Sequence, residues 1–430
     1  MFDRDGHRNR YGHRLENLPI SGIEAASELK ILFTITGPWG TGAATVVDGV
    51  VQELQNLGHK IKVIFPDLGL PSPDADKYYG NPELYHIIQF PIEFQGVDFP
   101  TFPLIIPDPN PRNLRMAWTF KNMTETEFKS YIDFLKFRLQ EVIQEFQPDV
   151  IETEHIWLMG YVLNALGYTY IVGAHNSDQM GFRYDPRMRP YATICANNAE
   201  HIFSISDAVK LKCLKLYGVP DEKVIVIPNG YDNQIFQPRQ LSKEDVFQKH
   251  GIDAEVSLPV VTFGGKMSRT KGVDVLLEAN AMLQKKRPFT LLLFGSGDLE
   301  DVLGRIPTRE EKQNAHLIGH VTQDVLAQFH NIAEFSVLPS RDEGFAVAAL
   351  EAMGCRLPMV ATDIPSLKEL IVGKIVPIED PKALADAMEL LLNLPAEEKK
   401  SLKEKSYRKA LGFSWKKNTE MRLNYYKTVI

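Results

Sequence analysis

Short apolar runs alternate with amphipathic stretches through the first half of the chain. The apolar runs lie at 31–35, 60–65, 149–151, 168–172 and 201–205. Residues 43–56, between the first two runs, repeat their apolar positions with the period of an α-helix. Strands that alternate with helices favour a parallel α/β sheet, because parallel neighbours need a crossover connection.

The second half repeats this order after a polar, irregular segment at 238–258, which we interpret as a linker. Its apolar runs lie at 260–263, 290–294, 316–318 and 335–338, with helical stretches near 273–284 and 324–329. We therefore expect an α/β protein with two doubly wound, Rossmann-like domains. The expected parts are a polar extension at 1–28, domains at 29–237 and 259–412, and a final helix at 413–430.

Length and composition fit this organisation. A chain of 430 residues exceeds the usual size of one hydrophobic core, so two domains are expected. With 44% hydrophobic and 24% charged residues it has the composition of a soluble globular protein, and its net charge of −7 argues against a nucleic-acid partner. Cys195, Cys213 and Cys355 lack metal-ligand spacing and cannot all pair, so we interpret them as reduced thiols of a cytoplasmic protein.

The sequence also limits contact with membranes. The first residues are charged and lack the apolar segment of a signal peptide. No apolar run approaches the roughly 18–20 residues that are needed to span a bilayer. We therefore expect no transmembrane segment, while peripheral docking at a membrane stays open.

The most informative segment runs from Ser340 to Met353. It follows an apolar strand and holds two carboxylates, Glu343 and Glu351, eight positions apart. A strand, a turn and a helix N-terminus make an anion site, because unpaired N–H groups and the helix dipole point to one place. Glu343 would lie at the mouth of that site, and Glu351, about two turns into the helix, could accept hydrogen bonds from sugar hydroxyls. A nucleotide-sugar suits such a site; the alternative is a pair of surface glutamates.

Several segments resemble the donor signature of glycosyltransferase family 4, the glycosyl transferases group 1. They are Pro228–Asp232 with Phe236 and Pro238, Phe263–Met267 with Lys271–Asp274, Phe294–Asp298, Glu343–Phe345, Glu351–Met353, Pro358–Asp363 and Phe413–Trp415. The resemblance extends from about Lys30 to the C-terminus. It implies the GT-B fold, in which two Rossmann-like domains face each other across a cleft. It also implies a retaining transfer without a protein nucleophile, and a last helix that crosses back to the first domain.

Two lysines, Lys266 and Lys271, flank the turn after the strand at 260–263. Two ammonium groups at one strand end can stabilise a diphosphate as a leaving group; the alternative is two solvated lysines on a loop. The family usually has arginine at the position of Lys266, and lysine keeps the charge but loses the bidentate fork. The resemblance further implies that Glu351 holds the ribose and that Glu343 orients the sugar.

Two segments of the first half complete the predicted site. Gly37–Ala43 follows the first strand and opens a helix, so its glycines let a phosphate or sugar approach the backbone. This segment is not G-x-G-x-x-G, and a nicotinamide-binding domain is a poor fit. His175 follows the strand at 168–172, and the resemblance implies that it contacts the donor sugar; a histidine that caps a loop is the alternative. His155 is a similar but weaker candidate.

These interpretations combine into one predicted site. Catalytic roles are predicted for His175, Glu343, Lys266 and Lys271. Substrate contacts are predicted from Gly40, Gly42, Lys266, Lys271, Gly344, Phe345, Ala346, Val347 and Glu351. The sequence Asp74-Ala75-Asp76 resembles a metal-binding D-x-D, but its composition favours a turn. We therefore expect transfer without a metal ion and without a cofactor.

One long segment interrupts the alternation, from about Pro66 to Asn122, and it contains a proline-rich apolar run at 100–112. Long insertions in compact domains are often binding loops. We interpret this segment as the place of acceptor recognition; a rigid loop that caps the sheet is the alternative.

We predict a retaining, metal-independent glycosyltransferase (hexosyltransferase) that uses a nucleoside-diphosphate sugar, with UDP as the first choice of nucleotide and GDP as the second. The acceptor would be a hydroxyl of a saccharide, a lipid-linked saccharide or a small metabolite. Two alternatives stay open: a nucleotide-sugar epimerase of the same fold, and a non-catalytic GT-B protein that binds sugar nucleotides. Ala346 and Pro365, where the family has glycine, motivate the second alternative, and Arg356 is a third departure of this kind.

Overall fold

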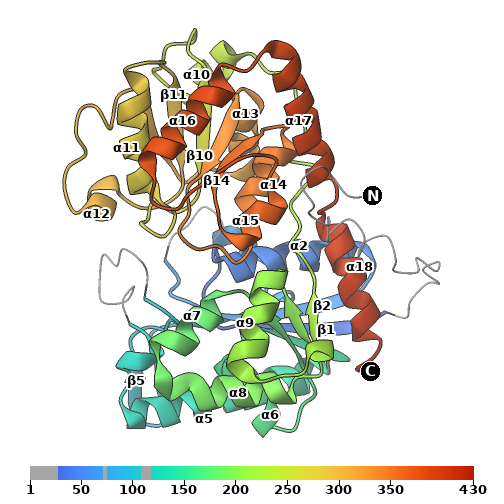
Figure 1. The fold of residues 1–430 in the computed structure, drawn as a ribbon. Helices are drawn as coiled ribbons and strands as arrows, with labels where there is room; N and C mark the ends of the chain where they lie inside the picture. Colours follow the sequence, from blue (N-terminus) through green and yellow to red (C-terminus); the bar gives the residue numbers. More distant parts are fainter. Residues whose placement is uncertain (1–27, 71–74, 108–117) are drawn as a thin grey trace.

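The computed structural model describes residues 28–70, 75–107 and 118–430. The chain forms two α/β lobes that face each other, with most of the N-terminal half in one and most of the C-terminal half in the other (Figure 1). This confirms the expected architecture of two Rossmann-like domains. Apart from its last residue, the predicted polar extension lies outside the described residues.

Each lobe contains one parallel sheet, and the described strand order fixes its topology. The first sheet has seven strands, in the order β3 (Tyr85–Gln89), β2 (Lys60–Asp67), β1 (Lys30–Ile35), β6 (Val150–Glu154), β7 (Ile171–Ala174), β8 (Ile202–Ser204) and β9 (Val224–Val226). The second has six, in the order β12 (Ala315–Gly319), β11 (Thr290–Phe294), β10 (Val260–Gly264), β13 (Phe335–Leu338), β14 (Met359–Thr362) and β15 (Gly373–Val376). A small antiparallel pair, β4 (Ile92–Phe94) and β5 (Val97–Phe99), lies apart from both.

The central strands are nearly continuous apolar runs because both faces of each sheet are covered by helices. β11 buries all five of its residues and β13 all four. Three strands that the sequence did not predict, β3, β9 and β15, are edge strands. Two of the four residues of β15 are exposed, so its apolar pattern is weak.

The helices of the first lobe connect its strands. They are α2 (Gly42–Asn56), α3 (Ala75–Tyr79), α5 (Glu125–Phe146), α6 (Leu158–Ala165), α7 (Ser177–Tyr184), α8 (Arg189–Asn198) and α9 (Asp207–Tyr217). The start of α5 is fixed by a capping box, in which Thr124 Oγ1 accepts from the Glu127 N–H and the Glu127 carboxylate accepts from the Thr124 N–H.

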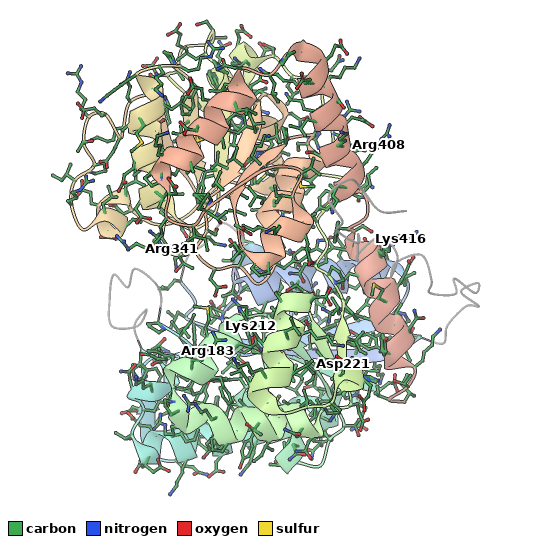
Figure 2. All side chains as sticks on the ribbon, viewed as in Figure 1. Arg183, Lys212, Asp221, Arg341, Arg408 and Lys416 are labelled. Carbon is green, nitrogen blue, oxygen red and sulfur yellow. The ribbon has the colours of Figure 1, made fainter. Side chains whose placement is uncertain are left out.

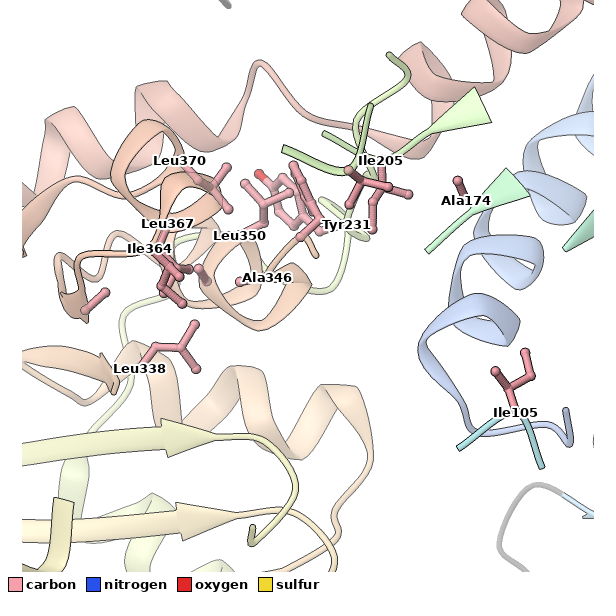
Figure 3. Packing of buried hydrophobic residues seen from close by; sticks show 14 of the residues in the cluster. Ile105, Ala174, Ile205, Tyr231, Leu338, Ala346, Leu350, Ile364, Leu367 and Leu370 are labelled. Carbon is pink, nitrogen blue, oxygen red and sulfur yellow. The ribbon is translucent and has the colours of Figure 1, made fainter. Parts of the chain in front are cut away.

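The second half contains the other α-helices of the described residues. They are α10 (Lys243–His250), α11 (Val273–Gln284), α12 (Leu299–Leu303), α13 (Gln323–Asn331), α14 (Val347–Gly354), α15 (Pro365–Leu370), α16 (Pro381–Leu392), α17 (Ala396–Ala410) and α18 (Trp415–Tyr426). The segment expected to be an irregular linker contains α10, which Ser242 caps by accepting from the Asp245 N–H. Leu350 of α14 and Leu367 and Leu370 of α15 pack together in the core (Figure 3).

The last helix, α18, packs beside α2 of the first lobe (Figure 1). Gly49 of α2 makes this contact possible, because a Cβ atom there would lie 2.3 Å from the Trp415 ring. Asn418 also donates to the carbonyl of Pro228 at 2.7 Å. The last helix therefore lies against the first lobe. Among the described residues, no helix is both long and apolar enough to cross a bilayer.

The strand orders decide where a ligand can bind. In the first sheet the order reverses between β1 and β6, and in the second it reverses between β10 and β13. Open parallel sheets bind ligands beyond the carboxyl ends of the strands at such a point. The residues just after β1, β6 and β10 line a common cavity.

Candidate functional site

A cavity of about 750 Å³ lies between the two lobes. This volume is within the range of small-molecule sites, about 300–1,000 Å³. All the site residues predicted from the sequence line it: Gly40, Gly42, His175, Lys266, Lys271, Glu343, Gly344, Phe345, Ala346, Val347 and Glu351. The structure therefore brings the predicted residues of both halves together.

Lys271 and Glu343 form an ion pair on the wall of this cavity. Lys271 Nζ lies 2.5 Å from Glu343 Oε1, which also accepts from Ser340 Oγ at 2.8 Å. The Glu343 side chain is 7% exposed and that of Lys271 is 29% exposed. The ammonium group is thus the more accessible partner, and the carboxylate is held in place by two donors.

The loop that carries Glu343 is fixed from both lobes. Ser366 Oγ donates to the Glu343 carbonyl at 2.8 Å. A Cβ atom at Gly344 would lie 2.8 Å from Asn176 Cβ, so glycine lets the loop pack against the first lobe. Pro365 is the first residue of α15, where a missing N–H breaks no helical hydrogen bond. The departure at Pro365 is therefore compatible with the local fold.

Lys266 lies in the turn after β10, and backbone hydrogen bonds tie this turn to the loop after β11. The N–H of Gly265 donates to the carbonyl of Phe294 at 2.9 Å, and that of Met267 donates to Ser296 at 2.8 Å. Lys266 and Lys271 consequently approach the cavity from the same end of the second sheet.

Helix α14 begins at the cavity, where Ala346 and Val347 line the wall. Its N-cap residue, Ala346, makes no side-chain hydrogen bond to the first N–H groups. These groups and the helix dipole favour an anion at this end of the helix. Together with the two lysines, they supply hydrogen-bond donors to this part of the cavity.

Glu351 lies further along α14, on the cavity wall. Burial raises the pKa of its carboxyl to about 7, against a smaller opposing effect of the hydrogen bond from Gln323. That bond is long, at 3.4 Å. A ligand that donates to Glu351 would therefore replace weak solvation with stronger hydrogen bonds.

The first-lobe wall includes the loop before α2. Gly40 has a φ of 83°, a backbone conformation that favours glycine. Thr41 caps α2 by accepting from the Ala44 N–H at 3.4 Å, and the helix begins at Gly42. Gly40 and Gly42 both line the cavity opposite the second lobe.

His175 lies just after β7, and its ring forms a short contact with a buried glutamate. His175 Nε2 lies 2.5 Å from Oε2 of Glu154, the last residue of β6. Asp178 accepts from the His175 N–H at 3.0 Å and fixes the backbone. Burial raises the pKa of the Glu154 carboxyl and lowers that of the His175 imidazole. His155, the weaker candidate, also lines the cavity, with its ring centroid 5.2 Å from that of His175.

Polar contacts join the lobes beside His175. Asn176 donates to the Asp342 carboxylate at 3.1 Å, and Lys212 Nζ lies 3.6 Å from the same carboxylate. Lys212 and Arg341 both lie near the boundary of the two lobes (Figure 2). Because Asp342 precedes Glu343, these contacts hold the Glu343 loop against the first lobe.

Other cavity residues lie outside the set of individually predicted site residues. Leu104–Ile106 form part of the wall and belong to the long insertion; residues 108–112 of its proline-rich run lie outside the described residues. His320 and Gln323 line the cavity near Glu351. The insertion that contains Leu104–Ile106 was predicted to recognise the acceptor, whereas His320 and Gln323 stand in no motif recognised from the sequence.

The Asp74–Asp76 segment differs from its prediction. Ala75 and Asp76 lie in helix α3, so the predicted turn is wrong there, and Asp74 is not described. Tyr78 of this helix packs on Trp39, with ring centroids 4.1 Å apart, which anchors the short helix. Within the described part of the chain, no three His, Cys, Asp or Glu side chains are arranged to hold a metal ion.

Two family models match the chain. Residues 40–234 match Glycosyltransferase Family 4, and residues 258–394 match Glycosyl transferases group 1. The D-inositol 3-phosphate glycosyltransferase of Jonesia denitrificans is 27% identical over 50% of this chain and 53% of that protein. The match thus spans about half the length of that relative. An uncharacterised glycosyltransferase of Methanocaldococcus jannaschii is 27% identical over 70% of this chain and 85% of that protein.

Solved structures share the fold. Sucrose-phosphate synthase from Thermosynechococcus elongatus has a TM-score of 0.69 at 18% identity, over 94% of this chain and 99% of that chain. Anabaena HepE, in complex with UDP and glucose, has a TM-score of 0.69 at 14% identity, over 93% of this chain and 100% of that chain. At these identities the similarity concerns the fold, which is GT-B.

Proposed function

Because the chain belongs to glycosyltransferase family 4, we propose that it transfers a sugar from a nucleoside diphosphate to a hydroxyl group of an acceptor. The observation that carries this proposal is the arrangement at one end of the second sheet. There, two lysines and the uncapped start of α14 face the same cavity as Glu343 and Glu351. Cations and N–H donors suit a diphosphate, and carboxylates suit sugar hydroxyls.

Lys266 and Lys271 would act on the leaving group. As the bond between the sugar C1 and the diphosphate oxygen breaks, negative charge develops on the diphosphate. Two ammonium groups and the α14 N-terminus stabilise that charge without rearrangement, because the fold already holds them there. We therefore propose transfer that needs no metal ion.

The carboxylates would hold the neutral parts of the donor. Glu351 would accept hydrogen bonds from the ribose hydroxyls, and Glu343, held by Lys271 and Ser340, would accept from the sugar. His175 would contact the sugar from the first lobe. Gly344 and Phe345 to Val347 would line the donor with backbone, and Gly40 and Gly42 would do so from the opposite wall.

We infer a retaining transfer without a covalent intermediate. The acceptor oxygen would attack C1 on the face from which the diphosphate leaves. The acceptor proton would pass to the departing diphosphate, so the products are the glycoside and a protonated nucleoside diphosphate. In this reaction the lysines stabilise the leaving diphosphate, and no protein nucleophile is needed.

UDP is our first choice of nucleotide and GDP the second. In support of UDP, a structural neighbour, Anabaena HepE, is described in complex with UDP and with UDP-glucose. The acceptor would lie against Leu104–Ile106 in the first lobe, and would be a saccharide, a lipid-linked saccharide or a small metabolite. Some relatives are named D-inositol 3-phosphate glycosyltransferases, which supports a small polyol among the candidates.

The test combines binding with transfer. Titration calorimetry with UDP and GDP would identify the nucleotide, and UDP- or GDP-sugars with an acceptor panel would then be assayed in excess chelator. We expect UDP to bind more tightly than GDP. In excess chelator, release of UDP should depend on the acceptor. NMR should show an α-linked product when the donor is α-linked. Binding of neither nucleotide would contradict the proposal. Acceptor-independent release with an altered sugar would indicate an epimerase.

A further inference from the structure

Buried ionisable side chains from distant parts of the chain lie behind the first-lobe wall of the cavity. Glu154 is fully buried, and its Oε2 lies 2.5 Å from His175 Nε2. Gly173, on the neighbouring strand β7, leaves room for this pair: a Cβ atom there would lie 1.9 Å from Glu154 Oε2 and 3.0 Å from His175 Nε2. The backbone is thus shaped around the Glu154–His175 contact.

Helix α18 reaches the other side of Glu154. Arg422 Nη1 lies 3.9 Å from Glu154 Oε1, and its guanidinium also contacts the Glu152 carboxylate. Tyr426 donates to Glu152 at 2.5 Å. The Arg422 side chain is only 2% exposed, so α18 places a buried cation beside two buried carboxylates. A continuous chain of contacts therefore runs from α18 through Glu154 to His175 and the cavity.

A histidine with one nitrogen bound to a carboxylate has a restricted ring orientation, and the shared proton decides its tautomer. If Glu154 is ionised and accepts from Nε2–H, then Nδ1 is an acceptor. If Glu154 is protonated and donates to Nε2, then Nδ1 carries the hydrogen. Burial and the Asp178 carboxylate raise the pKa of Glu154, and the cation Arg422 lies on the other side of the carboxylate.

From this geometry we propose that Glu154 is a positioning residue, which fixes the ring orientation and the proton of His175, and that Arg422 anchors it from α18. The C-terminal helix would then set the state of a side chain at the sugar site. This inference rests on the proposed function, because it assumes that His175 meets the donor sugar. Other ionisable groups also face the pair: Glu152 of β6, His155 after β6, Asp178 of α7 and Tyr426 of α18.

The chain offers a matched control for Glu154. Glu152 lies two positions earlier on β6, is equally buried and contacts the same arginine, but its carboxylate is bonded to Tyr426 and Arg422 rather than to His175. A purely structural role would make Glu154→Gln and Glu152→Gln behave alike. A positioning role would change kcat and its pH profile in Glu154→Gln but not in Glu152→Gln.

The kinetic test compares both variants with the parent, at several pH values. We expect Glu154→Gln to lower kcat about 10- to 100-fold, with the donor KM within about threefold and a changed pH profile of kcat. Glu152→Gln should keep the parent profile and a kcat within about threefold, even if its thermal midpoint falls. Equal losses in both variants, or no change in Glu154→Gln, would overturn the proposal.

A second measurement does not depend on activity. In histidine-labelled protein, the two ring nitrogens of His175 give chemical shifts that report its tautomer, and a His175→Asn variant assigns them. We expect these shifts to change in Glu154→Gln and to stay at the parent values in Glu152→Gln. If the parent transfers no sugar, the proposed function fails while this comparison still tests the contact. If Glu154→Gln does not fold, Glu154→Asp, which keeps the charge but shortens the reach, should show the same shift change; unchanged shifts would refute the proposal.

Discussion

The two walls of the cavity use charge in different ways. On the second-lobe wall, Lys271 is partly exposed and pairs with Glu343 at the edge of the cavity. On the first-lobe wall, the charges lie behind the surface: Glu152, Glu154 and Arg422 are buried and pair with one another. The first arrangement presents charge to a ligand, whereas the second holds a histidine and the last helix in place.

This difference predicts different consequences of substitution. Charges that face a ligand can be removed with a large loss of activity and a small loss of stability. Buried paired charges cannot, because removal of one partner leaves the other uncompensated in a medium of low dielectric constant. The following predictions test this contrast, from the largest expected effect to the smallest.

Removal of the buried cation should have the largest effect. We expect Arg422→Met to lower the free energy of unfolding by about 3–5 kcal/mol, because Glu152 and Glu154 lose their cation. Urea denaturation would measure this loss. Arg408→Met is the control: that side chain is 75% exposed and pairs with Glu404 on one helix face, so its loss should stay below about 1 kcal/mol. Similar losses for the two variants would show that the buried cluster is no more important to stability than a surface pair.

Removal of a ligand-facing cation should show the opposite pattern. We expect Lys271→Met to raise the barrier to transfer by about 2–4 kcal/mol, roughly 30- to 1,000-fold in kcat. Its thermal midpoint should stay near that of the parent, because the lysine is partly solvated and Ser340 still holds Glu343. Lys286→Met, a change at an exposed lysine outside the cavity lining, controls for loss of charge. Parent-like turnover in Lys271→Met would remove the lysine from the mechanism.

The same contrast explains which parts of the site could be predicted from the sequence. On the second-lobe wall, each strand, turn and helix start is continuous in the chain, so Lys266, Glu343 and Glu351 could be identified from local patterns. On the first-lobe wall, His175 could be identified because it follows a strand. Glu154 and Arg422 could not, because their contact joins segments separated by most of the chain, and a glutamate in a strand gives no local signal for a buried partner.

The fold shows a parallel limit. The central strands could be predicted because burial on both faces makes them continuous apolar runs. Strands β3, β9 and β15 were missed because their residues are partly exposed and each strand is short, so none forms a continuous apolar run. Helix α10 was missed because its sequence is largely polar and only Val246 and Phe247 are buried.

Substitutions of the two glutamates on the second-lobe wall should have different effects on nucleotide binding. If Glu351 accepts hydrogen bonds from the ribose, Glu351→Gln should weaken binding of the bare nucleoside diphosphate by about 1.5–3 kcal/mol. The loss should be larger for the ribonucleotide than for the 2′-deoxyribonucleotide, which already lacks one hydroxyl. Glu343→Gln should spare nucleotide binding and impair sugar transfer. Equal calorimetric losses in both variants would mean that the two carboxylates are misassigned.

The smallest expected effect is a pH-dependent gain in stability from the same Glu351→Gln change. Burial raises the pKa of Glu351 from 4.5 to about 7, so between these values the unfolded chain has lost a proton that the folded chain keeps. Stability contributed by this group therefore falls as the pH rises from about 4.5 to 7. Without ligand, the free energy of unfolding of Glu351→Gln should exceed that of the parent by about 1–2 kcal/mol at pH 8 and by little near pH 4.5. The figure at pH 8 is reduced because the carboxylate has some contact with water.

Glu311 provides a control of opposite sign for this measurement. Hydrogen bonds from Arg305 lower the pKa of Glu311 to about 2, so its contribution to stability is present above about pH 4.5 and is lost as the pH falls toward 2. Glu311→Gln should therefore be less stable than the parent at pH 8, and the deficit should shrink on acidification. Chemical denaturation at pH 8, 6 and 4.5 would follow the Glu351 effect, and a further measurement near pH 3 would follow the loss of the Glu311 contribution. A Glu351→Gln variant that is less stable than the parent at pH 8 would show that the cavity wall already solvates this carboxylate without a ligand, and would weaken the distinction between charges that serve a ligand and charges that serve the fold.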